Sequence, residues 1–315
     1  MRQLTPAVFS TAGLPEQRRV ELWEDHNADA LIGLRCRTLT AASLEATEIN
    51  LQLDQIHLAR VRGNSHVVER DQALVRRRPA GSIALFFSLA GEAFFYHDDG
   101  VRTVRPGEML MCDADRPFMR GFSQGLEELV VKVPRQVFAE VTGIEHVPSP
   151  AVVGFARGGN PFAHALARQV GAAARSEDPR PAREQDLLDL IAALAGRSPA
   201  GGHRAAAQAH IDSNFADPAL SAARVAAAVG LSTRHLSRVF AESGISVPQY
   251  ILSRRLEAAR RMLAGPVPIA EVAHRCGFAS PAHFSHAFRA HFGERASDLR
   301  RSAIASRSGR DEPHS

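Results

Sequence analysis

The chain has 315 residues, of which 45% are hydrophobic, and its formal net charge is +4. This length suits two domains of ordinary size, and the apolar content is sufficient for two cores. No apolar run approaches the roughly 18 residues of a membrane-spanning helix, and the first ten residues lack a signal-peptide core. We therefore expect a cytoplasmic protein with no membrane partner, and three scattered cysteines agree with a reducing compartment.

The first half of the chain predicts one helix followed by many short strands. Residues 15–33 have a helical pattern, and turn signals such as Asp98-Asp99-Gly100 and Pro106-Gly107 separate the β-type runs that come later. The runs expected to form strands are LDQIHLARVRG, SIALFFSLAG, EAFFYHDDG, VRTVRPGEMLMCDADRP, FMRGF and LEELVVKVP. Many short strands at this spacing predict a small barrel or a double-sheet roll.

A barrel of this kind raises the question of a metal enzyme. A metal-binding barrel of the cupin type needs two close His residues and a carboxylate, then a further His after the Pro-Gly turn. His57, His66 and His97 are instead scattered, and no His follows that turn until His146. We therefore expect no metal and no cofactor.

A second enzyme pattern matches in its residue types but not in the local structure that it needs. Residues 121–125 match Gly-x-Ser-x-Gly, in which a nucleophilic serine needs a strand before it and a helix after it. The residues that follow, LEELVVKV, alternate like a strand, so the glycines favour a hairpin turn around Ser123. We expect no catalytic residue here, and an enzyme of the hydrolytic or cupin kind is the least favoured alternative.

From residue 160 to residue 196 the pattern becomes helical. Leu187, Leu188, Ile191 and Leu194 form an apolar stripe that must be buried somewhere. Two alternatives stay open: the helix over residues 184–195 packs back on the barrel, or it forms a dimer contact. The Gly/Pro/Ser-rich residues 197–203 predict a linker.

A motif then occurs twice at a constant offset of 48 residues. STRHLSRVFAESG begins at Ser232, and SPAHFSHAFRAHFG begins at Ser280. Each copy predicts a helix that opens on a capping serine, and Pro281 suits the first helical position. In each copy apolar residues recur at helical spacing, with Leu236 and Phe240 matching Phe284 and Phe288.

The residues before each copy repeat as well. LSAARVAAAVGL predicts a short helix that ends at Gly230, and PIAEVAHRCGF predicts one that ends at Gly277. A helix, a glycine turn and a second capped helix make a helix-turn-helix, whose second helix can enter the major groove of DNA. Residues 246–265 predict a joining helix of about 18 residues, roughly 27 Å long, which could place both recognition helices on successive grooves.

Residues 204–301 resemble the DNA-binding domain of AraC/XylS-type transcription regulators, which carries two helix-turn-helix units joined by a long helix. The second-unit pattern IAEVAHRCGFASPAHFSHAFRAHFG is specific to that domain. Residues 51–134, including RPGEMLMCDADRPF, are similar to the cupin-like sensor domain of a subgroup of the same family. The resemblance implies an α+β protein: an N-terminal cupin-like β-roll with flanking helices, and a C-terminal all-α domain of two helix-turn-helix units.

Charge distribution agrees with binding to DNA. Residues 204–301 contain 13 arginines and seven acidic residues, a net charge of +6. Helical geometry and the resemblance place one set of side chains toward base edges: Arg234, Ser237, Arg238, Ala282, Ser285 and His286. A second set is expected on the DNA backbone: Ser232, His235, Ser280, His283 and Arg289.

The sequence thus predicts a sequence-specific DNA-binding transcription regulator and not an enzyme. The expected regions are a sensing and possible dimerisation domain over 1–196, the linker 197–203, the DNA-binding domain 204–301 and a disordered tail 302–315. The expected partners are double-stranded promoter DNA, a small-molecule effector, a second copy of the chain and, for an activator, RNA polymerase. The main alternative is a ligand-blind DNA-binding regulator that a partner protein controls. A hydrolytic or cupin enzyme with a DNA-binding appendage is less favoured.

Overall fold

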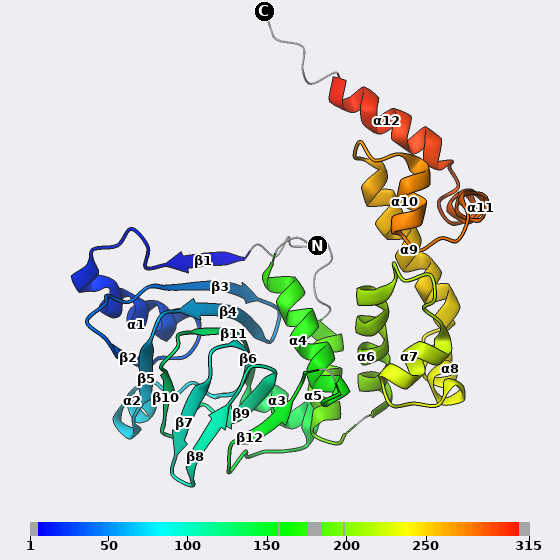
Figure 1. The fold of residues 1–315 in the computed structure, drawn as a ribbon. Coiled ribbons are helices and arrows are strands. Elements are labelled where there is room, and N and C mark those ends of the chain that lie inside the picture. Colours follow the sequence, from blue (N-terminus) through cyan, green and yellow to red (C-terminus); the bar gives the residue numbers. More distant parts are fainter. Residues whose placement is uncertain (1–5, 157, 176–183, 198, 309–315) are drawn as a thin grey trace, which may run out of the picture. The chain divides into compact units, whose positions relative to one another are not determined.

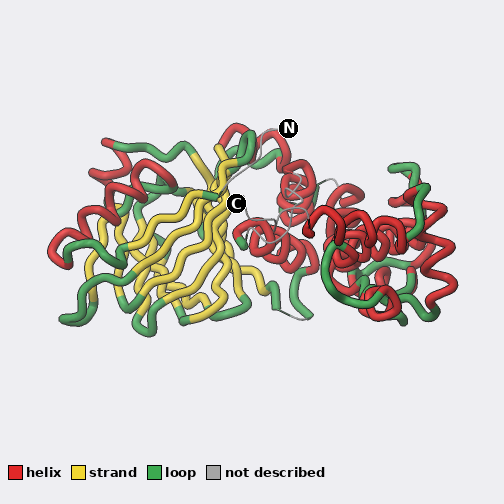
Figure 2. The backbone as a smooth tube through the Cα atoms, turned by 90° about the horizontal axis from the view of Figure 1, so that it is seen from above, coloured by secondary structure: helices red, strands yellow, loops and turns green. Residues whose placement is uncertain are grey.

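A computed structural model describes residues 6–156, 158–175, 184–197 and 199–308 of the chain. The chain divides into two compact units, residues 1–206 and 207–315. Among the described residues, the strands all lie in the first unit, whereas the second contains helices and connecting loops (Figures 1 and 2). This arrangement confirms the predicted α+β class. None of the described helices is long and apolar enough to cross a membrane.

Two antiparallel sheets build the first unit (Figure 1). The seven-stranded sheet has, in spatial order, β1 (Ala7–Ser10), β3 (Ala46–Gln52), β4 (His57–Gly63), β11 (Leu126–Pro134), β6 (Ser82–Ala90), β9 (Glu108–Asp113) and β12 (Ala151–Gly154). The five-stranded sheet has β2 (Arg35–Thr38), β5 (His66–Arg70), β10 (Phe118–Phe122), β7 (Ala93–His97) and β8 (Gly100–Val104). The double-sheet roll expected from the short strands is therefore present, and β4 and β6–β11 coincide with the predicted runs.

An apolar core fills the space between the two sheets. Side chains alternate in direction along a strand, so every second residue can enter this core. Phe86 of the larger sheet and Phe95, Phe118 and Phe122 of the smaller sheet are each at most 4% exposed and belong to one cluster. Helix α1 (Arg19–Ala30), preceded by the 3-10 turn η1 (Glu16–Arg18), adds Trp23 to the same cluster. The predicted N-terminal helix thus contributes to the barrel interior.

The sequence did not indicate several shorter elements. These are β1, β2, β3, β5, β12, α2 (Gln72–Arg77) and α3 (Arg135–Thr142). All of them are four to eight residues long, which is too short for a clear periodicity. Charged side chains also interrupt the apolar pattern of β3 and β5, where Glu48 and Arg70 are fully buried.

Helices α4 (Pro161–Ala174) and α5 (Glu184–Leu194) pack beside the larger sheet. Helix α4 contacts β3, β4 and β11, and α5 contacts α3 and α4. Leu187, Leu188 and Ile191 of α5 are at most 3% exposed, while Leu194 is half-buried. The stripe is therefore already covered within this chain, which supports packing and not a dimer contact as its role.

The expected linker 197–203 differs from the structure. Helix α6 (Pro199–Asn214) begins inside it, and the first compact unit ends at residue 206 and not at residue 196. The glycines serve close packing instead of flexibility: a Cβ added at Gly201 would lie 2.7 Å from Oδ2 of Asp189, and one at Gly202 would lie 2.2 Å from Cβ of Ala193. Only residues without a side chain let α6 approach α5 this closely.

The second unit contains two helix-turn-helix pairs. The first pair is α7 (Ala222–Ala228) and α8 (Thr233–Ala241), and the second is α10 (Ile269–Arg275) and α11 (Pro281–Phe292). Helix α9 (Val247–Leu263) joins them and starts with a capping box formed by Ser246 and Gln249. The turn residues Gly230 and Gly277 have φ values of 70° and 77°, the left-handed region that glycine adopts most easily.

The C-terminal end also differs from the expectation. Helix α12 (Ala296–Ser308) extends through the first half of the predicted disordered tail 302–315. Residues 309–315 lie outside the described residues.

Candidate nucleic-acid interface and barrel cavity

Helix α8 separates its apolar and polar sides completely. Its cap forms as predicted, because the Ser232 hydroxyl accepts a hydrogen bond from the His235 backbone N–H at 3.2 Å. Leu236, Val239 and Phe240 are at most 2% exposed. The exposed side carries Arg234, Ser237 and Arg238, the three residues predicted to face base edges.

Helix α11 repeats this arrangement in the second pair. The Ser280 hydroxyl accepts from the His283 backbone N–H, also at 3.2 Å, and Pro281 occupies the first turn. Phe284 and Phe288 are fully buried. The predicted polar stripe is exposed, and its members are Ala282, Ser285, His286 and Arg289. The two helices therefore present equivalent faces to solvent.

The histidines that follow the caps differ between the two copies. His283 is exposed, and its ring meets the edge of Phe278 with the ring centroids 5.7 Å apart. His235 is half-buried in the corresponding position. The first recognition helix is also shorter, with nine residues against twelve.

Several arginines of the second unit form ion pairs and hydrogen bonds within the fold. The sequence did not predict this structural role. Arg254 of α9 is 5% exposed and pairs with Asp212 and Glu257. Arg255 donates to the backbone oxygens of Phe215 and Asp217, at 2.8 Å each. The net charge of residues 204–301 therefore overstates the positive charge available to phosphates.

The arginines of the recognition helices differ from these in having no acidic partner within the described part of the chain. Among the described residues, no acidic side chain forms an ion pair with Arg234, Arg238 or Arg289. Arg224 of α7 and Arg275 of α10, by contrast, pair with Asp217 and Glu271 at 2.7 Å. The guanidinium groups of Arg234, Arg238 and Arg289 thus lie on the two exposed stripes without an acidic partner in the described ranges.

A small cavity lies inside the barrel. Its walls are mostly aromatic and aliphatic, and its volume is about 30 Å³, room for one or two water molecules. The residues around it are Trp23, Asn27, Leu31, Ile32, Leu34, Val61, His66, Val68, Phe86, Phe118, Arg120, Phe122, Leu126 and Glu128. Polar groups are few in this wall, so each of them has a large effect on what the cavity can hold.

Arg120 and Glu128 form a buried ion pair in the cavity wall. Nη1 and Nη2 of Arg120 donate to Oε1 and Oε2 of Glu128 at 3.0 and 2.6 Å. The guanidinium carbon lies 4.0 Å from the ring centre of Phe86 and 4.9 Å from that of Phe122. Nε of Arg120 is buried, and no described residue accepts its hydrogen.

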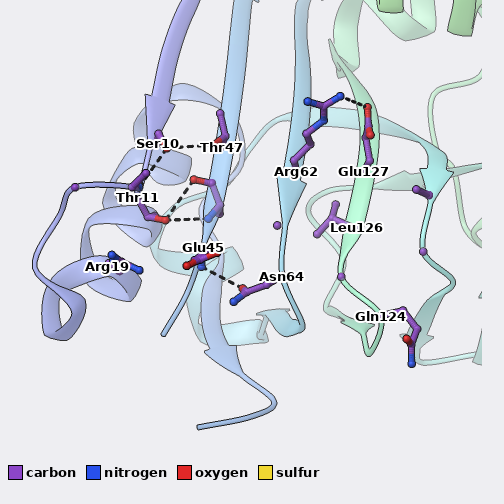
Figure 3. A pocket seen from close by; sticks show the side chains of 17 residues that line it. Ser10, Thr11, Arg19, Glu45, Thr47, Arg62, Asn64, Gln124, Leu126 and Glu127 are labelled. Carbon is purple, nitrogen blue, oxygen red and sulfur yellow. Dashed lines mark hydrogen bonds and ion pairs between the residues drawn. The ribbon is translucent and has the colours of Figure 1, made fainter. Parts of the chain in front are cut away.

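A larger, polar groove lies at the rim of the barrel, with a volume of about 620 Å³ (Figure 3). Several of its polar side chains are already engaged: Arg62 pairs with Glu127 at 3.0 Å, and the Thr11 hydroxyl lies within 3.3 Å of the Leu44 and Ala46 backbones. Leu126, at the start of β11, lines both this groove and the interior cavity.

Comparisons with known proteins support the same assignment. The model of an AraC-binding-like domain matches residues 23–258, and that of a helix-turn-helix domain matches residues 225–302. The chain belongs to the AraC-type transcription regulators. It is 25% identical over 252 residues to the transcriptional activator NphR of a Rhodococcus species, which covers 76% of this chain and 75% of NphR.

Two further likenesses are more limited. The regulator GlxA of Rhizobium meliloti (strain 1021) is 45% identical over 74 residues, 23% of either chain. The solved structure of the AraC-like activator CuxR aligns over 82% of this chain and 96% of that chain, at 20% identity and a TM-score of 0.48.

As an AraC-type regulator, the chain binds double-stranded DNA and regulates transcription. Both enzyme patterns lie in the first unit, whereas the two exposed stripes lie in the second. Residues 123–125 form the turn between β10 and β11, and Ser123 and Gly125 are bridged. The two strands belong to different sheets, so the predicted hairpin does not form. A strand and not a helix follows Ser123, unlike the arrangement around a nucleophilic serine. No group of three or more described His, Cys, Asp or Glu side chains is placed to hold a metal ion.

Proposed function

We propose that α8 and α11 of this AraC-type regulator read two segments of promoter DNA through their exposed stripes. The observation that carries this proposal is the repetition of one exposed polar face, with unpaired arginines, on two equivalently capped helices. Arg234 and Arg238 can each donate two hydrogen bonds to guanine, and Ser237 can bond to several bases. On α11, Ser285 and His286 supply polar contacts, and Ala282 suits the methyl group of thymine.

The residues at the helix starts fit the phosphate backbone. The Ser232 and Ser280 hydroxyl oxygens accept hydrogen bonds within their helices, so each O–H remains able to donate to a phosphate oxygen. His235 and His283 follow on the same turn. Arg289 lies one turn further along α11, where a phosphate contact sets position and not sequence preference.

The N-terminal unit is proposed to control DNA binding through a small-molecule effector. A ligand that binds one arrangement of the protein more tightly shifts the population toward that arrangement, by an amount set by the difference in affinity. The unpaired buried donor of Arg120 supports a ligand inside the barrel. The similarity to the transcriptional activator NphR supports transcriptional activation, which requires contact with RNA polymerase. We further propose that the protein acts in the cytoplasm as a homodimer.

The DNA-reading proposal is tested by selecting preferred duplexes from a random pool with the wild-type chain and with Arg238→Ala. The variant is expected to lose preference at one base position while binding the pool as a whole almost normally. Arg224→Ala is the matched control, because Arg224 is exposed on the non-reading helix α7 and pairs with Asp217. A selected motif that is unchanged in Arg238→Ala, or changed equally in Arg224→Ala, contradicts the face assignment.

A further inference from the structure

The chemistry of the barrel cavity narrows the kind of molecule that it can hold. Arg120 is 3% exposed, and its two terminal nitrogens are used by Glu128. The third donor of the same guanidinium, Nε–H, is buried and has no acceptor among the described residues. A buried donor without a partner is unfavourable, so a ligand oxygen placed against it would stabilise the complex.

His66 supplies a candidate acceptor in the cavity wall. His66 is 2% exposed, and its Nδ1 lies 2.7 Å from the Asn64 backbone oxygen. A carbonyl oxygen can only accept, so the proton is on Nδ1. Burial lowers the pKa of His66 below its ordinary value of 6.5, which keeps the ring neutral at pH 7. The remaining ring nitrogen, Nε2, therefore has a lone pair for a donor.

Charge in the cavity is already balanced. The positive Arg120 and the negative Glu128 neutralise each other, and His66 is neutral. A charged ligand would bring an uncompensated charge into a low-dielectric interior, which is strongly unfavourable. An uncharged molecule with an aromatic or alicyclic ring would instead pack against Trp23, Phe86 and Phe122.

The cavity and the rim groove meet at one side chain. Leu126 is half-buried and lines both hollows. Gly63, in the groove wall, leaves the necessary space: a Cβ added there would lie 3.0 Å from Cε1 of His66 and 3.5 Å from Cδ2 of Leu126. Figure 3 shows Leu126 within the groove beside Glu127. Movement of this one side chain would connect the interior with the surface.

We propose that the cavity and the groove are two parts of one binding site for an uncharged ring compound bearing a hydroxyl group, and that Leu126 is its gate. The hydroxyl oxygen accepts from Nε of Arg120, and its hydrogen is donated to Nε2 of His66. The ring displaces water and widens the cavity, since about 30 Å³ is too small for it. This inference rests on the proposed effector control and specifies the ligand class.

The test uses the full chain and fluorine NMR with 4-fluorophenol as the probe. Saturable binding is expected, whereas 4-fluorobenzoate and 4-fluorobenzylamine should bind at least about tenfold more weakly, since they are charged. 4-Fluoroanisole, which lacks the O–H donor, should also bind more weakly than 4-fluorophenol. The inference is overturned if 4-fluorophenol does not bind or if the charged probes bind equally well.

Leu126 variants test the gate without disturbing the buried ion pair. Leu126→Ala is expected to speed probe exchange several-fold, and Leu126→Trp to slow it. Val101→Ala is the matched control, because Val101 is an exposed apolar residue of β8 that lines neither hollow. Equal exchange rates in all variants would remove Leu126 as the gate. Because probe binding needs no DNA, its failure is distinguishable from failure of the DNA-reading proposal.

Discussion

Arg120 on β10 and Glu128 on β11 form a two-bond ion pair that joins the two sheets of the N-terminal barrel. The two strands follow each other in the chain but belong to different sheets. Both side chains are less than 10% exposed, and the pair lies on Phe86 and Phe122. The pair therefore tethers the sheets at the point where the cavity lies.

Breaking this pair on one side should destabilise the first unit. Arg120→Met leaves the Glu128 carboxylate buried without a partner, at an expected cost of about 3–5 kcal/mol in the free energy of unfolding. The double change Arg120→Met with Glu128→Leu should recover most of this loss, since no charge then remains buried. Urea unfolding followed by the fluorescence of Trp23, the single tryptophan of the chain, reports on this unit. A double variant no more stable than the single one would contradict this account.

Two arginines of the recognition helices should have different effects on DNA binding. Arg238→Ala should cost roughly 1–3 kcal/mol for the preferred duplex and much less for unrelated duplexes. Arg289→Ala should weaken all duplexes similarly and reduce the slope of log K against log salt by about one. Fluorescence anisotropy at several salt concentrations measures both. If the two variants behave alike, the division into base and phosphate contacts is wrong.

Acidic pH should destabilise the first unit through His66. Burial lowers its pKa in the folded state below the ordinary 6.5, so the unfolded chain binds the proton more readily. The free energy of unfolding should therefore fall as pH decreases below about 6.5. His57, whose pKa is also lowered by burial, acts in the same direction. His66→Gln should flatten the pH dependence of the Trp23-detected unfolding midpoint, and an unchanged slope would exclude His66 as a cause.

Close packing of α6 on α5 should make Gly202 intolerant of substitution. A Cβ at this position would lie 2.2 Å from that of Ala193, so Gly202→Ala should destabilise the first unit by roughly 1–3 kcal/mol. Gly154→Ala is the control, since nothing lies within 4 Å of a Cβ added there. Thermal unfolding of the two variants, again followed by Trp23, distinguishes steric crowding from a general effect of replacing glycine. Equal midpoints would show that α6 does not need the glycine.

Ser123 should be dispensable. It lies in the turn between β10 and β11, so Ser123→Ala is expected to leave both the operator affinity and any response to 4-fluorophenol unchanged. Incubation with p-nitrophenyl esters provides the opposing measurement. Ester turnover by the wild-type chain that disappears in Ser123→Ala would favour the hydrolase alternative.

The sequence alone determined much of the DNA-binding unit, because its signals are local. A capping serine, apolar residues at helical spacing and a turn glycine act within a few residues of one another, and they occur twice. The exposed positions of Arg234, Ser285 and their neighbours follow from the same periodicity. The central strands of the barrel were predicted for the same reason, since turn signals bound each run.

Residues of the same type have different roles in this protein, and only the tertiary structure decided between those roles. Arg238 and Arg254 are both helical arginines, but Asp212, 42 residues from Arg254 in the chain, turns Arg254 into a buried anchor. From the sequence, Gly201 and Gly202 indicated a linker. In the structure they pack against Asp189 and Ala193 of α5. Such contacts join residues that are distant in the sequence, and their side-chain geometry is set by packing between elements, which periodicity does not encode.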